Sequence, residues 1–75
     1  MELKIHKDKY NYKTVELVSS TLPNGRVMGL MPVHSLREAF DELLTELTLY
    51  NFDENTEEYK FVEENYKSLF DEMRK

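Results

Sequence analysis

The pattern of apolar and polar residues divides the chain into a strand-forming half and a helix-forming half. In the first half, Leu3 and Ile5 alternate with polar neighbours, and so do Val15 and Leu17. Alternation with a period of two is typical of a β-strand that buries one face. The sequence therefore predicts a strand at each of these places, joined by a turn over residues 8–11.

A tight turn is expected after the second of these strands. Asn24 and Gly25 both adopt positive φ at low cost, and an Asn-Gly pair between apolar stretches is a strong hairpin signal. The return strand then covers residues 27–31, and Pro32 ends it because proline cannot donate a ladder hydrogen bond. These elements together predict a small antiparallel β-meander of two or three strands within about residues 1–33.

The second half has the three- and four-residue spacing of two amphipathic helices. Ser35, followed three residues later by Glu38, is a capping-box pattern at the start of the first helix, which is expected over about residues 35–50. The second helix is expected over about residues 56–74. The apolar stripe of the first helix comprises Leu36, Ala39, Phe40, Leu43, Leu44, Leu47 and Tyr50.

A short link between the helices breaks the apolar spacing, and within it Asn55 and Asp53 are the two candidate caps of the second helix. A short link implies an antiparallel helix pair, and the sheet is the other element that can cover the apolar stripes. The expected fold is a single α+β domain over residues 1–75, in which two antiparallel amphipathic helices pack on the meander. The stripe of the second helix comprises Tyr59, Val62, Tyr66, Leu69, Phe70 and Met73.

Charge is distributed unevenly between the two halves. Residues 1–34 hold five basic and three acidic side chains, whereas residues 35–75 hold five basic and twelve acidic ones, within a net charge of −5. A net acidic chain opposes general nucleic-acid binding because phosphate repels it, but its charge favours contact with a basic protein surface. The second half is therefore the part that we expect to meet a partner.

The composition offers little catalytic or metal-binding chemistry. The chain has no cysteine, two histidines and two glycines, which excludes thiolate zinc sites and glycine-rich phosphate loops. The histidines, His6 and His34, are expected to be solvated at element boundaries. No serine stands in a nucleophile-elbow pattern, and nearly all carboxylates fall on polar helix faces rather than in a pocket. We therefore expect a protein that is not an enzyme and uses no metal or cofactor.

The sequence also bears on the compartment. Residues 1–6 do not begin a signal-peptide pattern, and no run approaches the roughly 20 apolar residues that a membrane span needs. The absence of cysteine fits a reducing compartment. We expect a cytoplasmic protein that does not bind membranes.

Two apolar residues break the helical stripes and mark candidate partner-binding positions. Phe61 lies away from the stripe of the second helix. Its face also holds Glu57, Glu64 and Asp71, and Leu49 lies similarly far from the stripe of the first helix. An aromatic anchor with a charged rim is a common interface design. The alternative is that a loop or the N-terminal strand covers Phe61 as part of the core.

The candidate functions fall into three classes. The leading hypothesis is a small acidic interaction module that binds a basic or mixed surface on a larger protein, by analogy with accessory or inhibitor proteins of bacteriophages and mobile elements. The alternative is a nucleic-acid-binding accessory protein that uses residues 7–13, where lysines and tyrosines interleave. That segment also fits a lysine-protected turn or edge strand. A structural homodimer that shares helical surfaces is the third hypothesis.

Overall fold

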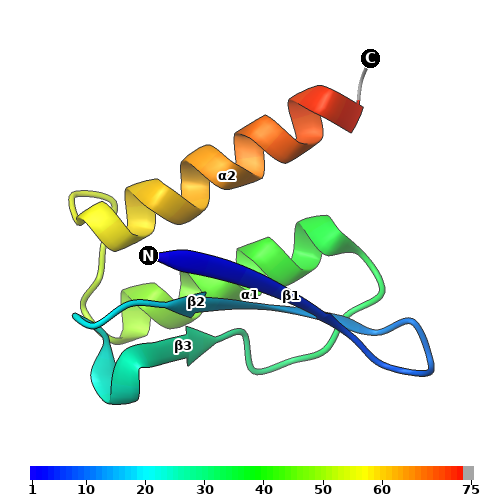
Figure 1. Ribbon diagram of the computed structural model, residues 1–75, viewed down its shortest axis with the longest axis horizontal. Helices are drawn as coiled ribbons and strands as arrows, with labels where there is room; N and C mark the ends of the chain where they lie inside the picture. The colour runs from blue at the N-terminus through cyan, green and yellow to red at the C-terminus, as the bar shows by residue number, and fades with distance from the viewer. Residues whose placement is uncertain (74–75) are drawn as a thin grey trace.

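A three-stranded antiparallel sheet and two helices make up the fold (Figure 1). The computed structural model describes the backbone of residues 1–73 and the side chains of residues 1–69. All strands precede the helices in the chain, which confirms the expected α+β class. The elements are, in order, β1 (Glu2–Lys7), β2 (Lys13–Val18), a 3-10 turn η1 (Pro23–Gly25), β3 (Arg26–Met28), α1 (Leu36–Leu49) and α2 (Glu57–Met73).

The sheet has the strand order β1-β2-β3, so β2 is its central strand. β1 pairs with β2 along its whole length, from Glu2 opposite Val18 to Lys7 opposite Lys13. The meander therefore has three strands, including the N-terminal one whose pairing the sequence left open. β1 and β3 form the two edges of this small sheet, and among the described residues no strand pairs with the outer edge of β1.

An aspartate side chain organises the turn between β1 and β2. Asp8 Oδ1 accepts hydrogen bonds from the backbone N–H groups of Tyr10 at 2.8 Å and of Tyr12 at 3.0 Å. Asn11 takes a φ of 65° in this turn, a left-handed conformation that asparagine tolerates better than most residues. The turn thus has the residue chemistry that its geometry requires.

The connection between β2 and β3 is longer than the expected two-residue hairpin. It spans residues 19–25, and the ladder resumes where Arg26 lies opposite Val18. Asn24 and Gly25 do take positive φ, 56° and 79°, but they end this loop instead of forming it alone.

Burial explains the longer loop. Leu22 is 5% exposed and belongs to the core, so the chain folds inward before the Asn-Gly pair. The Leu22 N–H donates to the Ser19 carbonyl at 3.1 Å, and the Gly25 N–H donates to the Leu22 carbonyl at 2.9 Å. A two-residue turn would have prolonged β2 through Leu22. The predicted two-residue hairpin is wrong because the turn residues alone do not show that Leu22 is drawn into the core.

β3 is also shorter than expected, because the chain bulges away from β2 after Gly29. The Gly29 N–H donates to the Val15 carbonyl at 3.3 Å, and pairing with β2 returns only at the bridge between Lys13 and Val33. Residues 30–32 therefore loop outward between two points of attachment. This bulge presents Leu30 as one of the most exposed apolar side chains, with 75% of its surface accessible.

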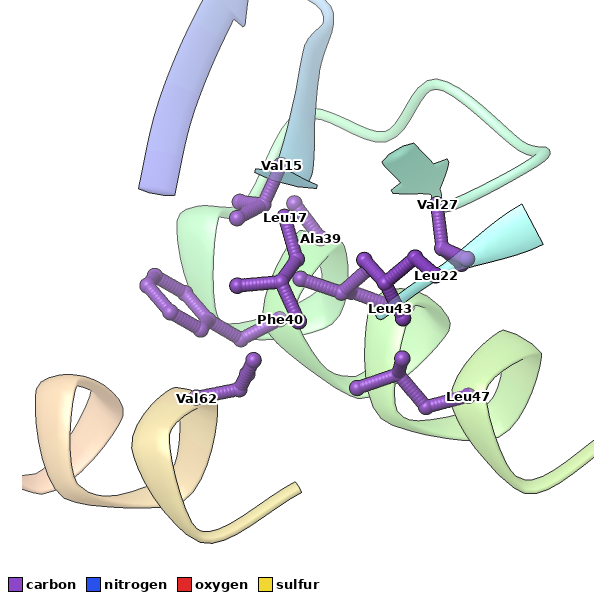
Figure 2. Close-up of a cluster of buried hydrophobic side chains, with 9 residues drawn as sticks. All are labelled: Val15, Leu17, Leu22, Val27, Ala39, Phe40, Leu43, Leu47 and Val62. Carbon is purple, nitrogen blue, oxygen red and sulfur yellow. The ribbon is translucent and has the colours of Figure 1, made fainter. Parts of the chain in front are cut away.

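One hydrophobic cluster joins the sheet to both helices. Its strand members project from one face of the sheet, α1 contributes the largest share, and α2 contributes one fully buried valine (Figure 2). The rings of Phe40 on α1 and Tyr66 on α2 meet edge to face, with centroids 5.3 Å apart. The cluster comprises Val15, Leu17, Leu22, Val27, Ala39, Phe40, Leu43, Leu47 and Val62.

α1 begins where the sequence predicts. Ser35 Oγ accepts a hydrogen bond from the Glu38 N–H at 3.5 Å and caps the helix. The expected apolar stripe is buried or half-buried as far as Leu47, but Tyr50, its last expected member, is 50% exposed. The sequence missed one buried member, Glu46, which is 7% exposed.

α2 runs in the direction opposite to α1 (Figure 1), but its cap differs from both candidates. The capping residue is Thr56, whose Oγ1 accepts a hydrogen bond from the Tyr59 N–H at 3.4 Å. Asp53 binds earlier in the link, where its Oδ1 accepts from the Asn55 N–H at 3.0 Å. Two members of the expected stripe, Phe70 and Met73, lie outside the described side chains.

Candidate functional site

The candidate partner-binding residues of α2 do not all share one environment. Glu57 and Glu64 are exposed, whereas Phe61 is half-buried and packs against the hydrophobic core. The side chain of Asp71 lies outside the described residues. Val62, the residue after Phe61, is fully buried. The side of α2 that the core covers therefore extends from Val62 to part of Phe61. Its ring therefore belongs partly to the core, and only the remainder is open to a partner.

Leu49, the candidate on α1, lies in a different kind of surface. It is 70% exposed at the C-terminal end of the helix, next to Tyr50. Tyr50 lines a pocket of about 250 Å³. The other walls of this pocket come from η1, from β3 and from the outward bulge after β3. The remaining lining residues are Pro23, Asn24, Arg26, Val27, Met28 and Leu30.

Sequence reasoning missed this pocket because its walls come from two distant parts of the chain, residues 23–30 and Tyr50. The available signal is the apolar pair Leu30–Met31 beside Pro32, which the pattern predicts as the end of a strand and which in fact forms the bulge. Among the lining residues Arg26 is the one with a permanent charge. The pocket thus offers apolar contact beside a cation, and its lining contains no carboxylate for acid–base chemistry.

A buried carboxylate, Glu16, lies with two basic side chains on the face of the sheet that points away from the helices; we call these three residues the Glu16 cluster. Glu16 Oε1 lies 3.1 Å from His6 Nε2, and its Oε2 accepts a hydrogen bond from Arg26 Nη1 at 3.5 Å. The Glu16 side chain is 6% exposed, against 49% for His6 and 68% for Arg26. Strand alternation could have placed all three residues on one face, but it gives no sign that the central one is buried.

The lysine- and tyrosine-rich segment over residues 7–13 is partly engaged within the protein. The Tyr12 ring stacks on His34 with centroids 4.0 Å apart, and Lys13 Nζ donates to the His34 carbonyl at 2.9 Å. Tyr10 remains 64% exposed.

Both histidines are exposed, as expected, but only His34 lies at an element boundary and each ring has a partner within the protein. His34 does precede α1, but its ring stacks on Tyr12, and His6 lies inside β1 and contacts Glu16. Among the described side chains, no group of three or more histidines and carboxylates is placed to hold a metal ion.

Neither helix, within the part of the chain that the structure describes, has the length and apolar content that a membrane crossing requires. Comparison of the chain with protein-family models, with curated proteins and with solved structures found no match. The fold and its surfaces are therefore what supports a function.

Proposed function

We propose that this protein is a small acidic, non-enzymatic interaction module whose helical side binds a basic or mixed surface on a larger protein. The observation that carries the proposal is the segregation of charge. Residues 36–69 hold ten acidic and three basic side chains, whereas residues 1–34 hold three acidic and five basic ones. Three basic residues can neutralise at most three of the ten carboxylates, so the helical side keeps a surplus of negative charge. A basic partner would complement that surplus.

Exposed carboxylates display this surplus on both helices. Glu38 and Asp41 are exposed on α1, and Glu57 and Glu64 are exposed on α2. Exposed charges of one sign raise the rate at which a partner of opposite sign associates, more than they raise the final affinity. The acidic surface is therefore suited to steering an encounter, and a firm complex needs apolar contact as well.

Leu49 and Tyr50 supply apolar contact at one end of the helix pair. They lie at the end of α1, and the chain returns within a few residues to begin α2 at Glu57 (Figure 1). Leu49 is 70% exposed and Tyr50 is 50% exposed. An exposed tyrosine beside an exposed leucine has the composition of an interface centre. In this proposal Phe61 contributes only the part of its ring that the core leaves open.

An accessory or inhibitor role of the kind that bacteriophages and mobile elements use, in the cytoplasm, is part of this proposal. It is supported by the small size, the net charge of −5 and the absence of cysteine. A protein inhibitor acts by occupying a surface and needs no reactive group of its own. The chain's chemistry is compatible with that mode of action.

The second candidate, binding of nucleic acid, is favoured by one observation and opposed by two. The exposed Tyr10 and the lysines beside it could stack on bases and contact phosphates. However, Tyr12 already stacks on His34, and Lys13 is bonded to backbone carbonyls. The net negative charge of the chain opposes phosphate as well.

The test uses wild-type protein and a charge-reversed variant as paired baits. Glu64→Lys should lose a specific partner from host extract that wild-type protein retains, and the purified partner should bind this variant about tenfold more weakly, chiefly through slower association at low salt. The matched control is Glu2→Lys, which changes the net charge equally but on β1. Equal loss for both variants would reduce the proposal to a general charge effect, and no loss for either would contradict it.

A fluorescently labelled single-stranded oligonucleotide separates the second candidate from the first. We expect no binding at physiological salt. Salt-dependent binding that disappears when Lys7 and Lys9 are changed to glutamate would favour the nucleic-acid function instead.

A further inference from the structure

The outer edge of β1 presents a regular set of backbone groups that no strand of the described residues pairs with. In antiparallel ladders, residues whose N–H and C=O groups face the partner strand alternate with residues whose groups face away. The Asp8 N–H donates to the Tyr12 carbonyl at 3.0 Å, which fixes the alternation. The same facing recurs at every second residue pair along the ladder, first at His6 and Thr14 and then at Lys4 and Glu16. Lys4 therefore directs its backbone groups at Glu16.

The backbone groups of Leu3 and Ile5 therefore point outward, away from β2. The second ladder agrees with this assignment, because the Ser19 N–H donates to the Gly25 carbonyl and the Gly29 N–H to the Val15 carbonyl. Odd-numbered residues of β2 thus face β3, and even-numbered ones face β1. The free edge runs along a strand that has no proline and pairs with β2 without a bulge.

The side chains along this edge are incompletely covered. Leu3 and Ile5 lie opposite Leu17 and Val15, on the helical face of the sheet, yet Ile5 remains 51% exposed. Met1, which precedes the strand, is 53% exposed. An edge of this kind is a template for another strand, and the sequence of β1 indicates which strand.

We propose that β1 pairs antiparallel with β1 of a second copy of this chain, across a two-fold axis at Leu3. Such a pair must keep the helical faces of both sheets on one side, so the axis must pass through a residue; a contact of at least three β1 positions allows Leu3, Lys4, Ile5 or His6. With the axis at Leu3, Glu2 of each copy lies opposite Lys4 of the other, and Met1 lies opposite Ile5. Opposite charges then face each other twice, and the half-exposed apolar side chains cover one another.

The other registers are less favourable. An axis at His6 places Ile5 opposite Lys7. It also places Asp8 opposite Lys4, but Asp8 already binds the turn backbone.

The remaining two registers bring like charges together. An axis at Lys4 places the two copies of Lys4 opposite each other, and an axis at Ile5 places Glu2 opposite Asp8. Like charges directly opposite each other destabilise a strand pair.

The Leu3 register also continues a pattern that already exists within one copy. Lys4 lies opposite Glu16 on β2, so the row across the joined sheets would read Glu2 of the second copy, Lys4, Glu16. The contact joins two three-stranded sheets into one continuous sheet, and the short paired length predicts a weak, concentration-dependent dimer. It uses an edge that the proposed helical interaction leaves free.

Amide hydrogen exchange at low and high protein concentration tests the pairing directly. The amides of Leu3 and Ile5 should be unprotected in dilute protein and become protected as the concentration rises to about millimolar, while sedimentation shows dimer. The Lys4 amide faces β2 and should be protected throughout. A rise in mass without protection of Leu3 and Ile5 would place the dimer on another surface, and an unchanged monomer mass would overturn the proposal.

Charge exchange tests the register. Glu2→Lys puts lysine opposite Lys4 in both halves of the contact and should weaken the dimer about tenfold or more; Lys4→Glu should do the same. An equal mixture of the two variants restores every opposite-charge pair and should form a heterodimer as readily as wild type. Failure of the mixture, with both variants folded by circular dichroism, would exclude this register.

A backbone variant keeps the test decisive if Lys4→Glu unfolds through its position opposite Glu16. Ile5→Pro removes only an outward N–H, which an edge strand tolerates, and should abolish the dimer while the monomer stays folded. A dimer that survives this change would contradict pairing through β1. If wild-type protein binds instead a strand from its larger partner, the Leu3 and Ile5 amides will be protected only in that complex.

Discussion

The two faces of the sheet both bury side chains at the centre of β2, but by different means. Val15 and Leu17 point to the helical side and are 0% exposed, and Glu16 between them points to the opposite side and is 4% exposed. The helical face is covered by α1 and the rest of the hydrophobic cluster. On the opposite face, Lys4 and Met28 of the neighbouring strands lie directly opposite Glu16.

The two kinds of cover stabilise the fold to different extents. Burial of apolar surface stabilises in proportion to the area removed from water, so Val15 and Leu17 contribute to stability outright. A buried carboxylate loses hydration free energy, and only the attraction and hydrogen bonds of its partners offset that loss. The partners of Glu16 are themselves well exposed, His6 at 49% and Arg26 at 68%. The helical face should therefore hold most of the stability, and the outer face should mainly fix side-chain positions.

Leu17→Ala tests the stable side and should have the largest effect. Its side chain is fully buried at the centre of the cluster, so we expect a loss of about 2–5 kcal/mol in the free energy of unfolding, measured by urea denaturation. Val18→Ala, on the same strand but the opposite face, is the control and should cost clearly less. Equal costs would remove the distinction between the faces.

Gly29→Ala tests how tightly the chain packs on α1 just after β3. An added Cβ would lie 3.0 Å from Glu42 Cβ and 3.3 Å from the Leu43 backbone nitrogen, so the chain must move away from the helix. We expect a loss of about 1–3 kcal/mol. Gly25 is the matched control, because a Cβ there meets nothing within 4 Å and the cost comes from its φ of 79°. Asparagine should partly rescue position 25 but not position 29.

Phe61→Ala tests how far the covered side extends along α2. A half-buried phenylalanine should contribute about half of the 1.5–3 kcal/mol of a fully buried one, so we expect a loss of about 0.8–1.5 kcal/mol. Leu49→Ala is the control, since Leu49 is 70% exposed and should change stability by less than about 0.5 kcal/mol. A neutral Phe61→Ala would return this ring to the surface, and a loss above about 3 kcal/mol would make it wholly core.

Glu16→Gln tests the outer face and should have the smallest effect. Glutamine keeps the shape of the side chain and one acceptor oxygen. The two ion pairs are lost, but His6 and Arg26 stay in contact with water. We expect a change of about 1 kcal/mol or less in the free energy of unfolding at neutral pH. A loss as large as that of Leu17→Ala would show that the Glu16 cluster is a second stabilising centre and would overturn the contrast between the faces.

Local chemistry in the sequence determined the elements and several of their ends. The alternation around Leu3 and Val15 predicted strands, the three- and four-residue spacing predicted both helices, and Ser35 with Glu38 predicted the start of α1. These signals succeed because they depend on near neighbours: a cap bonds to an N–H three residues away, and a strand or helix face repeats within one element. The sequence also determined the imbalance of charge between the two halves.

The tertiary structure decided the features that depend on contacts between distant parts of the chain. The inward fold of Leu22 lengthened the β2–β3 loop, the close approach of Gly29 to α1 accompanied the outward bulge, and packing against the core drew in part of Phe61. Glu16 is buried by strands on both sides, which its own polar character argued against. Burial is a property of the assembled neighbours rather than of the residue, and periodicity alone reveals only which residues share a face.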